Sequence, residues 1–254
     1  MIMRLDKMLA HLGYGSRKDV KQLIRKKEVL VNGNVITNDD YKVDSENDEV
    51  VVFNEVVNYS ELVYIMLNKP ENVVSATYDA KLKTVIDLLD VEYQNRKLFP
   101  VGRLDIDTVG LLLITNDGKL CHELLAPKKH VDKIYYVKFE GIFKDTYYDL
   151  FNSGIILEDG YKTLPSSIKL ESDNEAYITI HEGKFHQVKR MFEALNMKVI
   201  YLKRIQFKNL KLDENLKEGE YRLLTNKEIA DLKNDWRKDK PKWSWCNFKS
   251  NRKN

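Results

Sequence analysis

The feature that most constrains how this chain can fold is an uninterrupted apolar run, Leu111–Ile114. The turn sequence Asn116-Asp117-Gly118 follows it, and a short apolar run that ends at such a turn is typical of a buried strand. The polar segment before it, Gly102–Thr108, is then expected to be a loop anchored at the edge of a rigid sheet. Such loops commonly carry function, so we expect the chemistry at Asp105. The alternative is a strand entry where an Arg-Asp pair caps backbone groups.

The length and composition of the chain indicate a soluble protein of two unequal domains. Its 254 residues exceed one typical domain of about 150 residues, and its 43% of apolar residues can build a sizeable core. No apolar stretch approaches the ~20 residues needed to span a bilayer, and the first residues lack the apolar segment of a secretory signal. Cys121 and Cys246 are too isolated for a disulfide framework or a metal site. We expect a cytoplasmic protein without membrane association or bound metal.

Positive charge is concentrated at the two ends of the chain. The formal net charge is +3, but residues 236–254 hold seven Lys or Arg against one Asp, which leaves 35 basic and 38 acidic residues elsewhere. Residues 1–35 hold eight basic residues against three acidic ones. This asymmetry is typical of proteins that bind polyanions. For the first segment, solvated helix faces are the alternative explanation.

The first 36 residues predict a small module of two helices and a hairpin. Apolar residues recur at helical spacing from Leu5, and Ser16 with Asp19 forms a capping-box pattern that starts a second helix. Asn32-Gly33 between two short apolar runs is a strong hairpin signal. The pattern resembles the S4 RNA-binding module, whose opening Arg-Leu-Asp-Lys is present at Arg4–Lys7. A helical hairpin that merely packs on the main domain is the alternative.

The resemblance to S4 modules implies that residues 1–58 bind RNA. The basic residues expected to do so are Arg4, Lys7, Arg17, Lys18, Lys21, Arg25 and Lys26. Residues 54–62 have weak periodicity and are interpreted as a linker. At the other end of the chain, residues 234–254 contain all three tryptophans between basic residues. That composition suits contacts with RNA bases and phosphates, and it equally suits a disordered tail.

Residues 62–233 are expected to form a larger α+β domain. Short β-like runs dominate it, including Val63–Leu67, Tyr135–Phe139, Ala176–His181 and Val199–Leu202. Helical patterns interrupt these runs at Thr84–Leu89, Leu120–Leu125, Thr146–Asn152 and His186–Ala194. The mixture predicts a mixed, largely antiparallel sheet with a central cleft. No internal repeat and no Gly-rich phosphate loop is evident.

Several separated segments of this domain together resemble the pseudouridine synthases of the small-subunit ribosomal RNA type (RsuA type) and their large-subunit relatives. The segments are Asn68–Ser75, Gly102–Gly118, Lys133–Val137, Glu182–Met191, Leu202–Ile205 and Gly219–Leu224. The resemblance extends from Arg4 to about Lys233. It implies that the protein isomerises a uridine without a cofactor, after the nucleotide has left its stack.

The resemblance also implies roles for individual side chains. Asp105 would be the catalytic carboxylate, acting as a nucleophile or as a base. Tyr135 would stack on the target base, and Lys189 would pair with Asp105 and lower its pKa. Contacts with RNA are expected from further residues of the same segments, namely Lys69, Arg103, His186, Gln187 and Arg190.

Other interpretations of these residues stay open at this point. Tyr135 could be an ordinary core aromatic, and Lys189 a solvated charge on a helix. Asp107 could form a glycosidase-like pair with Asp105, but residues two apart in an extended chain point to opposite faces, so we interpret Asp107 as structural. Val109 and Lys184-Phe185 depart from the common pattern of the family, which bears on the substrate more than on activity.

These observations favour a monomeric pseudouridine synthase that modifies small-subunit (16S) ribosomal RNA, either naked or within a small-subunit assembly intermediate. The segments that most resemble the small-subunit branch are Arg4–Lys7, Tyr64–Pro70 and Asp105–Thr108. A large-subunit (23S) synthase of the same family is one alternative, and a non-catalytic RNA-binding assembly factor on the same scaffold is another. Similarity of fold does not separate these substrates, because target choice depends on loops and on the N-terminal module.

Overall fold

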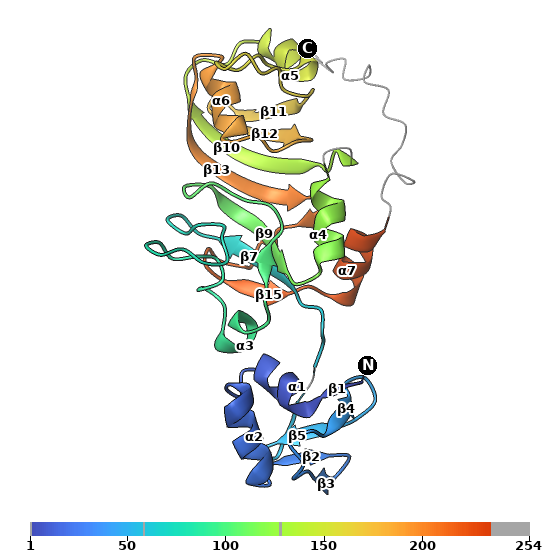
Figure 1. The fold of residues 1–254 in the computed structure, drawn as a ribbon. Coiled ribbons are helices and arrows are strands. Elements are labelled where there is room, and N and C mark those ends of the chain that lie inside the picture. The colour runs from blue at the N-terminus through green and yellow to red at the C-terminus, as the bar shows by residue number, and fades with distance from the viewer. Residues whose placement is uncertain (1, 58, 127–128, 235–254) are drawn as a thin grey trace.

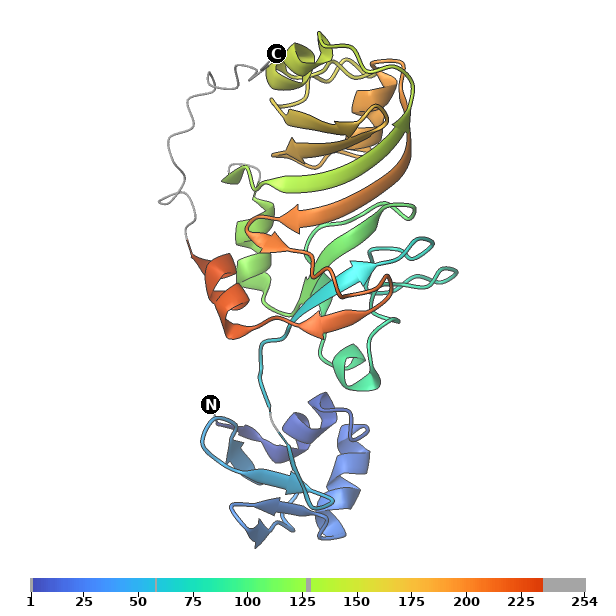
Figure 2. The same cartoon turned by 180° about the vertical axis from the view of Figure 1, so that it is seen from behind.

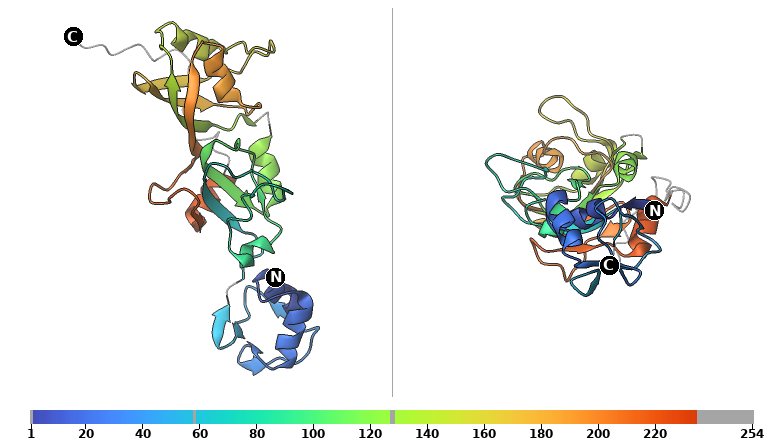
Figure 3. Two further views of the ribbon diagram at one scale, coloured as in Figure 1. Left: turned by 90° about the vertical axis from the view of Figure 1, so that its left-hand side faces the viewer. Right: turned by 60° about the horizontal axis from the view of Figure 1, so that its bottom comes forward.

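The computed structural model describes residues 2–57, 59–126 and 129–234. A small N-terminal module lies at one end of an elongated molecule, and a larger domain built on a curved sheet makes up the rest (Figure 1). The view from behind shows the connecting segment that leads from the module into the sheet (Figure 2). Seen from the side, the module and the larger domain occupy different ends of the molecule (Figure 3).

The N-terminal module combines two helices with two small antiparallel sheets. Its elements are β1 (Ile2–Arg4), α1 (Leu5–His11), α2 (Arg17–Arg25), β2 (Val29–Val31), β3 (Asn34–Val35), β4 (Lys42–Asp44), β5 (Val50–Val52) and β6 (Glu55–Val57). Strand β1 pairs with β4, and the second sheet has the order β3-β2-β5-β6. Both expected helices and the expected hairpin are therefore present.

Local sequence signals explain where α2 begins and how the chain turns between β2 and β3. The Ser16 hydroxyl accepts a hydrogen bond from the Asp19 N–H, and the Asp19 carboxylate accepts one from the Ser16 N–H, so the capping box forms. Asn32 and Gly33 have φ values of 51° and 75°, as the central residues of a type I′ turn require. Residues 55–57, which we interpreted as part of a linker, instead form β6, because they pair with β5.

One sheet of mixed direction forms the larger domain, with the strand order β11-β12-β10-β13-β9-β7-β15 and with β8 and β14 as short additions at β9 and β13. Its strands are β7 (Tyr64–Lys69), β8 (Phe99–Pro100), β9 (Val109–Thr115), β10 (Lys133–Glu140), β11 (Ser167–Ser172), β12 (Glu175–Ile180), β13 (Lys198–Phe207), β14 (Leu210–Lys211) and β15 (Tyr221–Leu223). Strands β9 and β13 run parallel, and the other strand pairs of the sheet are antiparallel. The predicted α+β class is confirmed.

Helices cover both faces of this sheet. Phe151 of α5 (Tyr147–Ser153) and Met191 of α6 (Gln187–Glu193) belong to the core on one face, whereas Leu124 of α4 (Gly118–Leu125) and Leu232 of α7 (Asn226–Lys233) belong to the other. The remaining helix, α3 (Val91–Gln94), is a single turn. No helix in the described part of the chain is long and apolar enough to cross a bilayer.

The helix that we expected at Thr84–Leu89 does not form. The Asp87 carboxylate accepts hydrogen bonds from both the Thr84 N–H and the Thr84 hydroxyl, at 2.7 and 2.8 Å. Side-chain oxygens of this kind compete with the helical backbone pattern, and here they close a turn. The helical prediction was wrong because the apolar spacing of so short a segment fits a buried turn as well as it fits a helix.

Strands β7 and β9 are buried on both faces, which explains the uninterrupted apolar run of β9. Leu112 packs in one core and Leu113 in the other. Gly110 lies where β9 meets β13, with φ +101°, and a Cβ at this position would come within 2.3 Å of the Arg204 carbonyl oxygen. Glycine therefore permits the close approach of the two parallel strands at the point where the Asp105 loop ends.

Candidate active site

The candidate site is centred on the loop between β8 and β9, which carries Asp105. The Thr108 N–H donates to the Asp105 carbonyl at 3.1 Å, so the segment Asp105–Thr108 is a turn. The Asp105 side chain is 28% exposed. It lines a small pocket of about 60 Å³ together with Arg103, Tyr135 and Lys184. Its carboxylate can therefore be reached from solvent through a recess in the protein surface.

The segment after β7 holds this loop in place. The Ser75 hydroxyl donates to the Leu104 carbonyl at 2.8 Å and accepts from the Leu104 N–H at 3.0 Å. The Asn72 N–H donates to the Ile106 carbonyl at 2.9 Å. Because the backbone is fixed on both sides of Asp105, the carboxylate is positioned before any substrate binds, which lowers the entropy cost of reaching a reactive geometry.

Lys69, which we expected to contact RNA, is instead part of this support. The residue is fully buried, and its Nζ donates to the carbonyl oxygens of Pro70, Ile106 and Thr108 at 2.9, 3.2 and 2.9 Å. Burial lowers the pKa of Lys69 to about 8. An ammonium group enclosed by three carbonyls presents no surface to a phosphate. We therefore correct the prediction: Lys69 positions the loop that carries Asp105.

Two basic side chains from the start of α6 face Asp105. Lys189 Nζ lies 3.9 Å from Asp105 Oδ2, and His186 Nε2 lies 3.7 Å from Oδ1. His186 occupies the N-cap of α6 with φ 48°, and its ring stacks on Phe185 with centroids 3.8 Å apart. The structure thus brings together Asp105 and Lys189 as the sequence predicts, and it adds His186, which is positively charged when it is protonated.

Asp107 also meets Lys189, contrary to our expectation that it would face away from Asp105. Lys189 Nζ lies 2.5 Å from Asp107 Oδ1. Partial burial is the largest single influence and raises the pKa of Asp107, but the hydrogen bond and charge of Lys189, together with weaker contributions, outweigh it, so the pKa is lowered. The alternation of side chains holds for extended strands, and the turn at Asp105–Thr108 breaks it. Lys189 therefore bridges two carboxylates.

Tyr135 is both a core aromatic and a residue of the candidate site, the two interpretations that the sequence left open. It lies on β10, is only 7% exposed and belongs to the main core cluster. The same side chain lines the pocket beside Asp105. Most of the ring is therefore held by core packing, while the rest forms part of the pocket wall. Arg103, which is exposed, lines the same pocket from the loop itself.

Two residues that we expected to contact RNA are engaged elsewhere. The buried Gln187 amide accepts from the Lys184 N–H and donates to Glu182, both at 2.9 Å, so it braces the turn before α6. Arg190 Nη2 lies 2.5 Å from the Asp159 carboxylate. Successive helical residues are about 100° apart around the axis, so Arg190 cannot face Asp105 when Lys189 does. The prediction of RNA contact is corrected for Gln187, which is buried, whereas for Arg190 it stays a prediction.

Ion pairs occupy several basic residues of the N-terminal module. Arg4 and Arg17 both pair with the buried Asp6 carboxylate, at 3.0 and 2.9 Å. Arg25 pairs with Asp39 at 2.5 Å. These arginines thus stabilise the module in addition to giving it positive charge. The lysines predicted to contact RNA lie at or near the surface: Lys7, Lys18 and Lys26 are exposed, and Lys21 is half-buried.

A larger cavity of about 420 Å³ lies next to the Asp105 pocket. The two share Arg103, Tyr135 and Lys184, and the larger cavity adds Lys133 and Arg204 to its wall. Lys133 and Arg204 lie in segments that resemble the family, but we predicted no role for either residue. A signal existed for Lys133, because it precedes Tyr135 by two residues on a strand and so lies on the same face.

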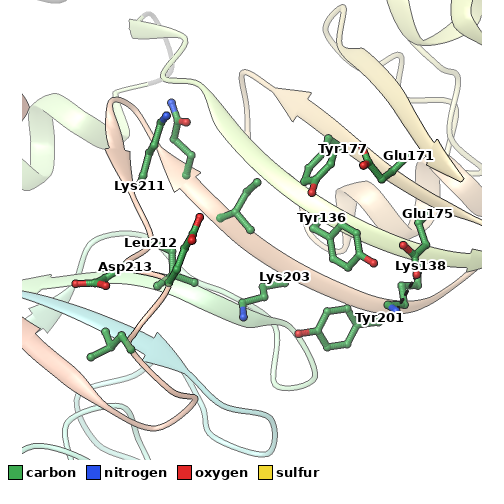
Figure 4. A pocket seen from close by; sticks show the side chains of 14 residues that line it. Tyr136, Lys138, Glu171, Glu175, Tyr177, Tyr201, Lys203, Lys211, Leu212 and Asp213 are labelled. Atoms are coloured by element: carbon green, nitrogen blue, oxygen red, sulfur yellow. Dashed lines mark ion pairs between the residues drawn. The ribbon is translucent and has the colours of Figure 1, made fainter.

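A different groove lies on the opposite face of β10, β12 and β13 (Figure 4). Its floor carries packed tyrosine rings, with Tyr136 centred 5.5 Å from Tyr177 and 6.2 Å from Tyr201. Three lysines and four carboxylates line it, and Lys138 pairs with Glu175 at 2.8 Å. The groove therefore lacks the excess of positive charge that binding to phosphates requires, and the candidate site remains the pocket of Asp105.

Comparison with known protein families matches residues 63–194 to RNA pseudouridylate synthases and residues 3–50 to the S4 domain. An uncharacterized RNA pseudouridine synthase of Bacillus subtilis is 46% identical over 232 residues, which cover 89% of this chain and 97% of that protein. In a crystal structure of a pseudouridylate synthase, the similar region covers 91% of this chain and 99% of that one, with 36% identity and a TM-score of 0.64.

The similar proteins include synthases named for each of the two ribosomal subunits. The ribosomal small subunit pseudouridine synthase A of Vibrio cholerae is 41% identical, over 91% of this chain and 99% of that protein. The ribosomal large subunit pseudouridine synthase B of Bacillus subtilis is 40% identical, over 91% of this chain and 95% of that protein. Identity alone therefore does not separate the two substrates.

Proposed function

The chain belongs to the family of RNA pseudouridylate synthases and carries an S4 domain, and from this premise we propose that it isomerises a uridine of small-subunit (16S) ribosomal RNA. The relative from Vibrio cholerae supports a small-subunit target by its name. The segments Arg4–Lys7 and Asp105–Thr108 support it by their resemblance to that branch. We further propose that the protein acts as a monomer in the cytoplasm, on naked RNA or on a small-subunit assembly intermediate.

The observation that carries the proposal is the placement of one carboxylate. Asp105 lies in a fixed turn, 28% exposed, with Lys189 and His186 within 4 Å of its oxygens and with Tyr135 lining the same pocket. A sugar placed against Asp105 would therefore have an aromatic ring within reach of its base. This is the combination that chemistry on a flipped nucleotide needs.

The reaction requires no redox change. The bond from ribose C1′ to uracil N1 breaks, C1′ joins C5 instead, and the proton lost from C5 is balanced by one gained at N1. Asp105 can attack C1′ as a nucleophile, or it can remove a proton from the sugar as a base, and both roles use the ionised carboxylate. Flipping the nucleotide costs a few kcal/mol, which stacking on Tyr135 can offset by about 1–3 kcal/mol.

Lys189 would organise the carboxylates during this reaction. It pairs with Asp107 at 2.5 Å and with Asp105 at 3.9 Å. The closer bond to Asp107 leaves the Asp105 oxygens less occupied by hydrogen bonds, and a carboxylate in that state is better able to approach the sugar. In this proposal Asp107 is therefore a positioning residue for Lys189.

A large-subunit (23S) synthase is the second candidate, and the relative named for the large subunit favours it by 40% identity. A non-catalytic assembly factor is a weaker alternative, because a protein that only binds RNA has no need for Asp105, Tyr135 and Lys189 in one site. Mapping of pseudouridines in ribosomal RNA from cells with and without the protein tests all three. We expect one 16S position to be lost; a lost 23S position would favour the second candidate, and no lost position would favour the assembly factor.

A further inference from the structure

The cavity next to the Asp105 pocket, here called the basic cavity, is lined by Arg103, Lys133, Lys184 and Arg204 among others. Its volume of about 420 Å³ lies within the range of small-ligand sites, roughly 300–1,000 Å³. The neighbouring Asp105 pocket measures about 60 Å³. Because the two cavities share part of their walls, they are direct neighbours.

Arg204 is the most unusual residue of the basic cavity. It is 2% exposed, its Nε donates to the Leu111 carbonyl at 2.7 Å, and its guanidinium carbon lies 5.1 Å from the Phe207 ring centroid. Its Nη2 is buried and finds no hydrogen-bond partner among the described residues. Burial of an unpaired charged donor is costly, and an anion in the adjoining cavity would reduce that cost through its electric field.

Lys133 adds a second cation, which is half-buried. Its Nζ donates to the Val131 carbonyl at 2.9 Å and lies 5.7 Å from the Phe207 ring centroid. Burial, followed by repulsion from Arg204, lowers the pKa of Lys133 to about 8. No carboxylate of the described residues lies within ion-pair distance of Lys133 or Arg204. The two cations are therefore close to each other without an ion-pair partner among the described residues, although the charges of Asp132 and Glu182 offset part of their repulsion.

Glu182 is the one carboxylate that the described residues place in the wall of the basic cavity, and it is already engaged. Glu182 accepts hydrogen bonds from the Tyr161 hydroxyl at 2.7 Å, from the Leu164 N–H at 2.8 Å and from Gln187 at 2.9 Å. Lys184 lies over the Tyr161 ring, 4.8 Å from its centroid, and is exposed to the cavity mouth. The cavity therefore combines surplus positive charge with an accessible aromatic and lysine at its entrance.

We propose that the basic cavity binds the nucleotide adjoining the target uridine, with its phosphodiester near Lys133 and Lys184. This inference rests on the proposed function, since the target sugar must lie at Asp105. A phosphodiester brings the negative charge that the cavity lacks, and the volume beside it holds a base. The cavity thereby fixes the register of the RNA strand relative to Asp105, which is a specificity role that the carboxylate cannot supply.

A double-mutant cycle between protein and RNA tests this proposal. The probe is an oligoribonucleotide that carries the mapped uridine, with either a normal or an uncharged methylphosphonate linkage on one side of it. The protein variants are Lys133→Met and Lys184→Met. The control is Lys138→Met, because Lys138 lies on the same strand as Lys133 but lines the groove of the opposite face. Dissociation constants and single-turnover rates are measured for each combination.

We expect the methylphosphonate to weaken binding to the wild-type protein and to Lys138→Met by about tenfold, in the range of a charge-assisted hydrogen bond. Lys133→Met and Lys184→Met should bind normal RNA about tenfold more weakly and should lose little more with the methylphosphonate. Rates at saturation should change much less than affinity. Lys184 is exposed, so its variant keeps the test valid even where Lys133→Met fails to fold.

Strictly additive losses, or unchanged binding by Lys184→Met, would show that the phosphodiester lies elsewhere. Those results overturn the cavity proposal alone as long as the wild-type protein forms pseudouridine in the normal oligonucleotide. A wild-type protein that modifies no ribosomal RNA overturns the proposed function and this inference with it. The two failures are therefore distinguishable by whether pseudouridine appears.

Discussion

At the scale of single residues, the proposed function requires that Asp105 reacts with the target nucleotide and does not only bind it. Replacement of Asp105 by Asn keeps the size of the side chain and removes its charge, so pseudouridine formation should fall by about 10²–10⁴-fold or more, while affinity for RNA stays nearly unchanged. Tritium release from 5-tritiated uridine and a filter-binding assay measure the two quantities. The matched control is Asp107→Asn, which should cost far less, because Asp107 contacts Lys189 and not the sugar. Normal activity in Asp105→Asn would refute the catalytic assignment.

Lys69 acts through the backbone that carries Asp105. Lys69→Met removes the donor to Pro70, Ile106 and Thr108, and unpaired buried carbonyls cost about 1–3 kcal/mol. We expect kcat to fall about tenfold while the Kd for RNA changes little, since the loop is displaced but every side chain that touches RNA is kept. Steady-state kinetics with a direct binding measurement separate these effects. A loss confined to Kd would instead return Lys69 to the RNA-binding surface.

The same lysine links stability to pH. The pKa of Lys69 is about 8 in the folded protein, below its ordinary value of 10.5. Between these values the unfolded chain binds more protons than the folded one, so stability should increase as pH rises. Lys133, whose pKa is also about 8, contributes in the same window. Denaturant unfolding from about pH 7 to about pH 10 should show the rise in the wild-type protein and a flatter curve in Lys69→Met.

At the scale of secondary-structure elements, the close pairing of β9 with β13 fixes the end of the loop that carries Asp105. Gly110→Ala places a Cβ within 2.3 Å of the Arg204 carbonyl oxygen at a φ of +101°, so the parallel pair must separate. We expect a loss of about 2–4 kcal/mol in the free energy of unfolding, from overpacking and backbone strain. Chemical denaturation measures it.

Gly118→Ala is the control for that substitution. Gly118 begins α4, and nothing lies within 4 Å of the position that its Cβ would take. The change should be neutral or stabilising by up to about 1 kcal/mol, because alanine favours helices. Equal effects of the two substitutions would mean that the β9–β13 junction tolerates separation.

At the scale of the whole molecule, positive charge at both ends of the chain should set the salt dependence of RNA binding. Residues 235–254 lie outside the described residues, so their prediction rests on sequence alone: seven basic residues and one acidic one from residue 236 onward. Removal of residues 236–254 should weaken RNA binding. The slope of log K against log salt should become shallower by about 0.7–0.9 for each phosphate that the shortened protein no longer neutralises. An unchanged slope would assign the tail no role in RNA binding.

The sequence alone determined those structural features that depend only on residues close together along the chain. The capping box of Ser16, the Asn32-Gly33 turn and the apolar run of β9 are local, so short-range chemistry specified them. Asp105, Tyr135 and Lys189 were singled out by the resemblance of their segments to the family, and local chemistry by itself assigned no role to Tyr135 or Lys189. Their contact, however, required strands β9 and β10 and helix α6 to come together.

Only the tertiary structure decided where side chains point. Lys69 lies inside because β7 is buried on both faces; Asp107 shares Lys189 because the loop turns; and Arg190 faces Asp159 because α6 rotates it away from Lys189. The charged wall formed by Lys133 and Arg204 joins residues 71 positions apart in the sequence. Strand pairing fixes such neighbours, and it is set by packing over the whole sheet, which no local pattern of residues encodes.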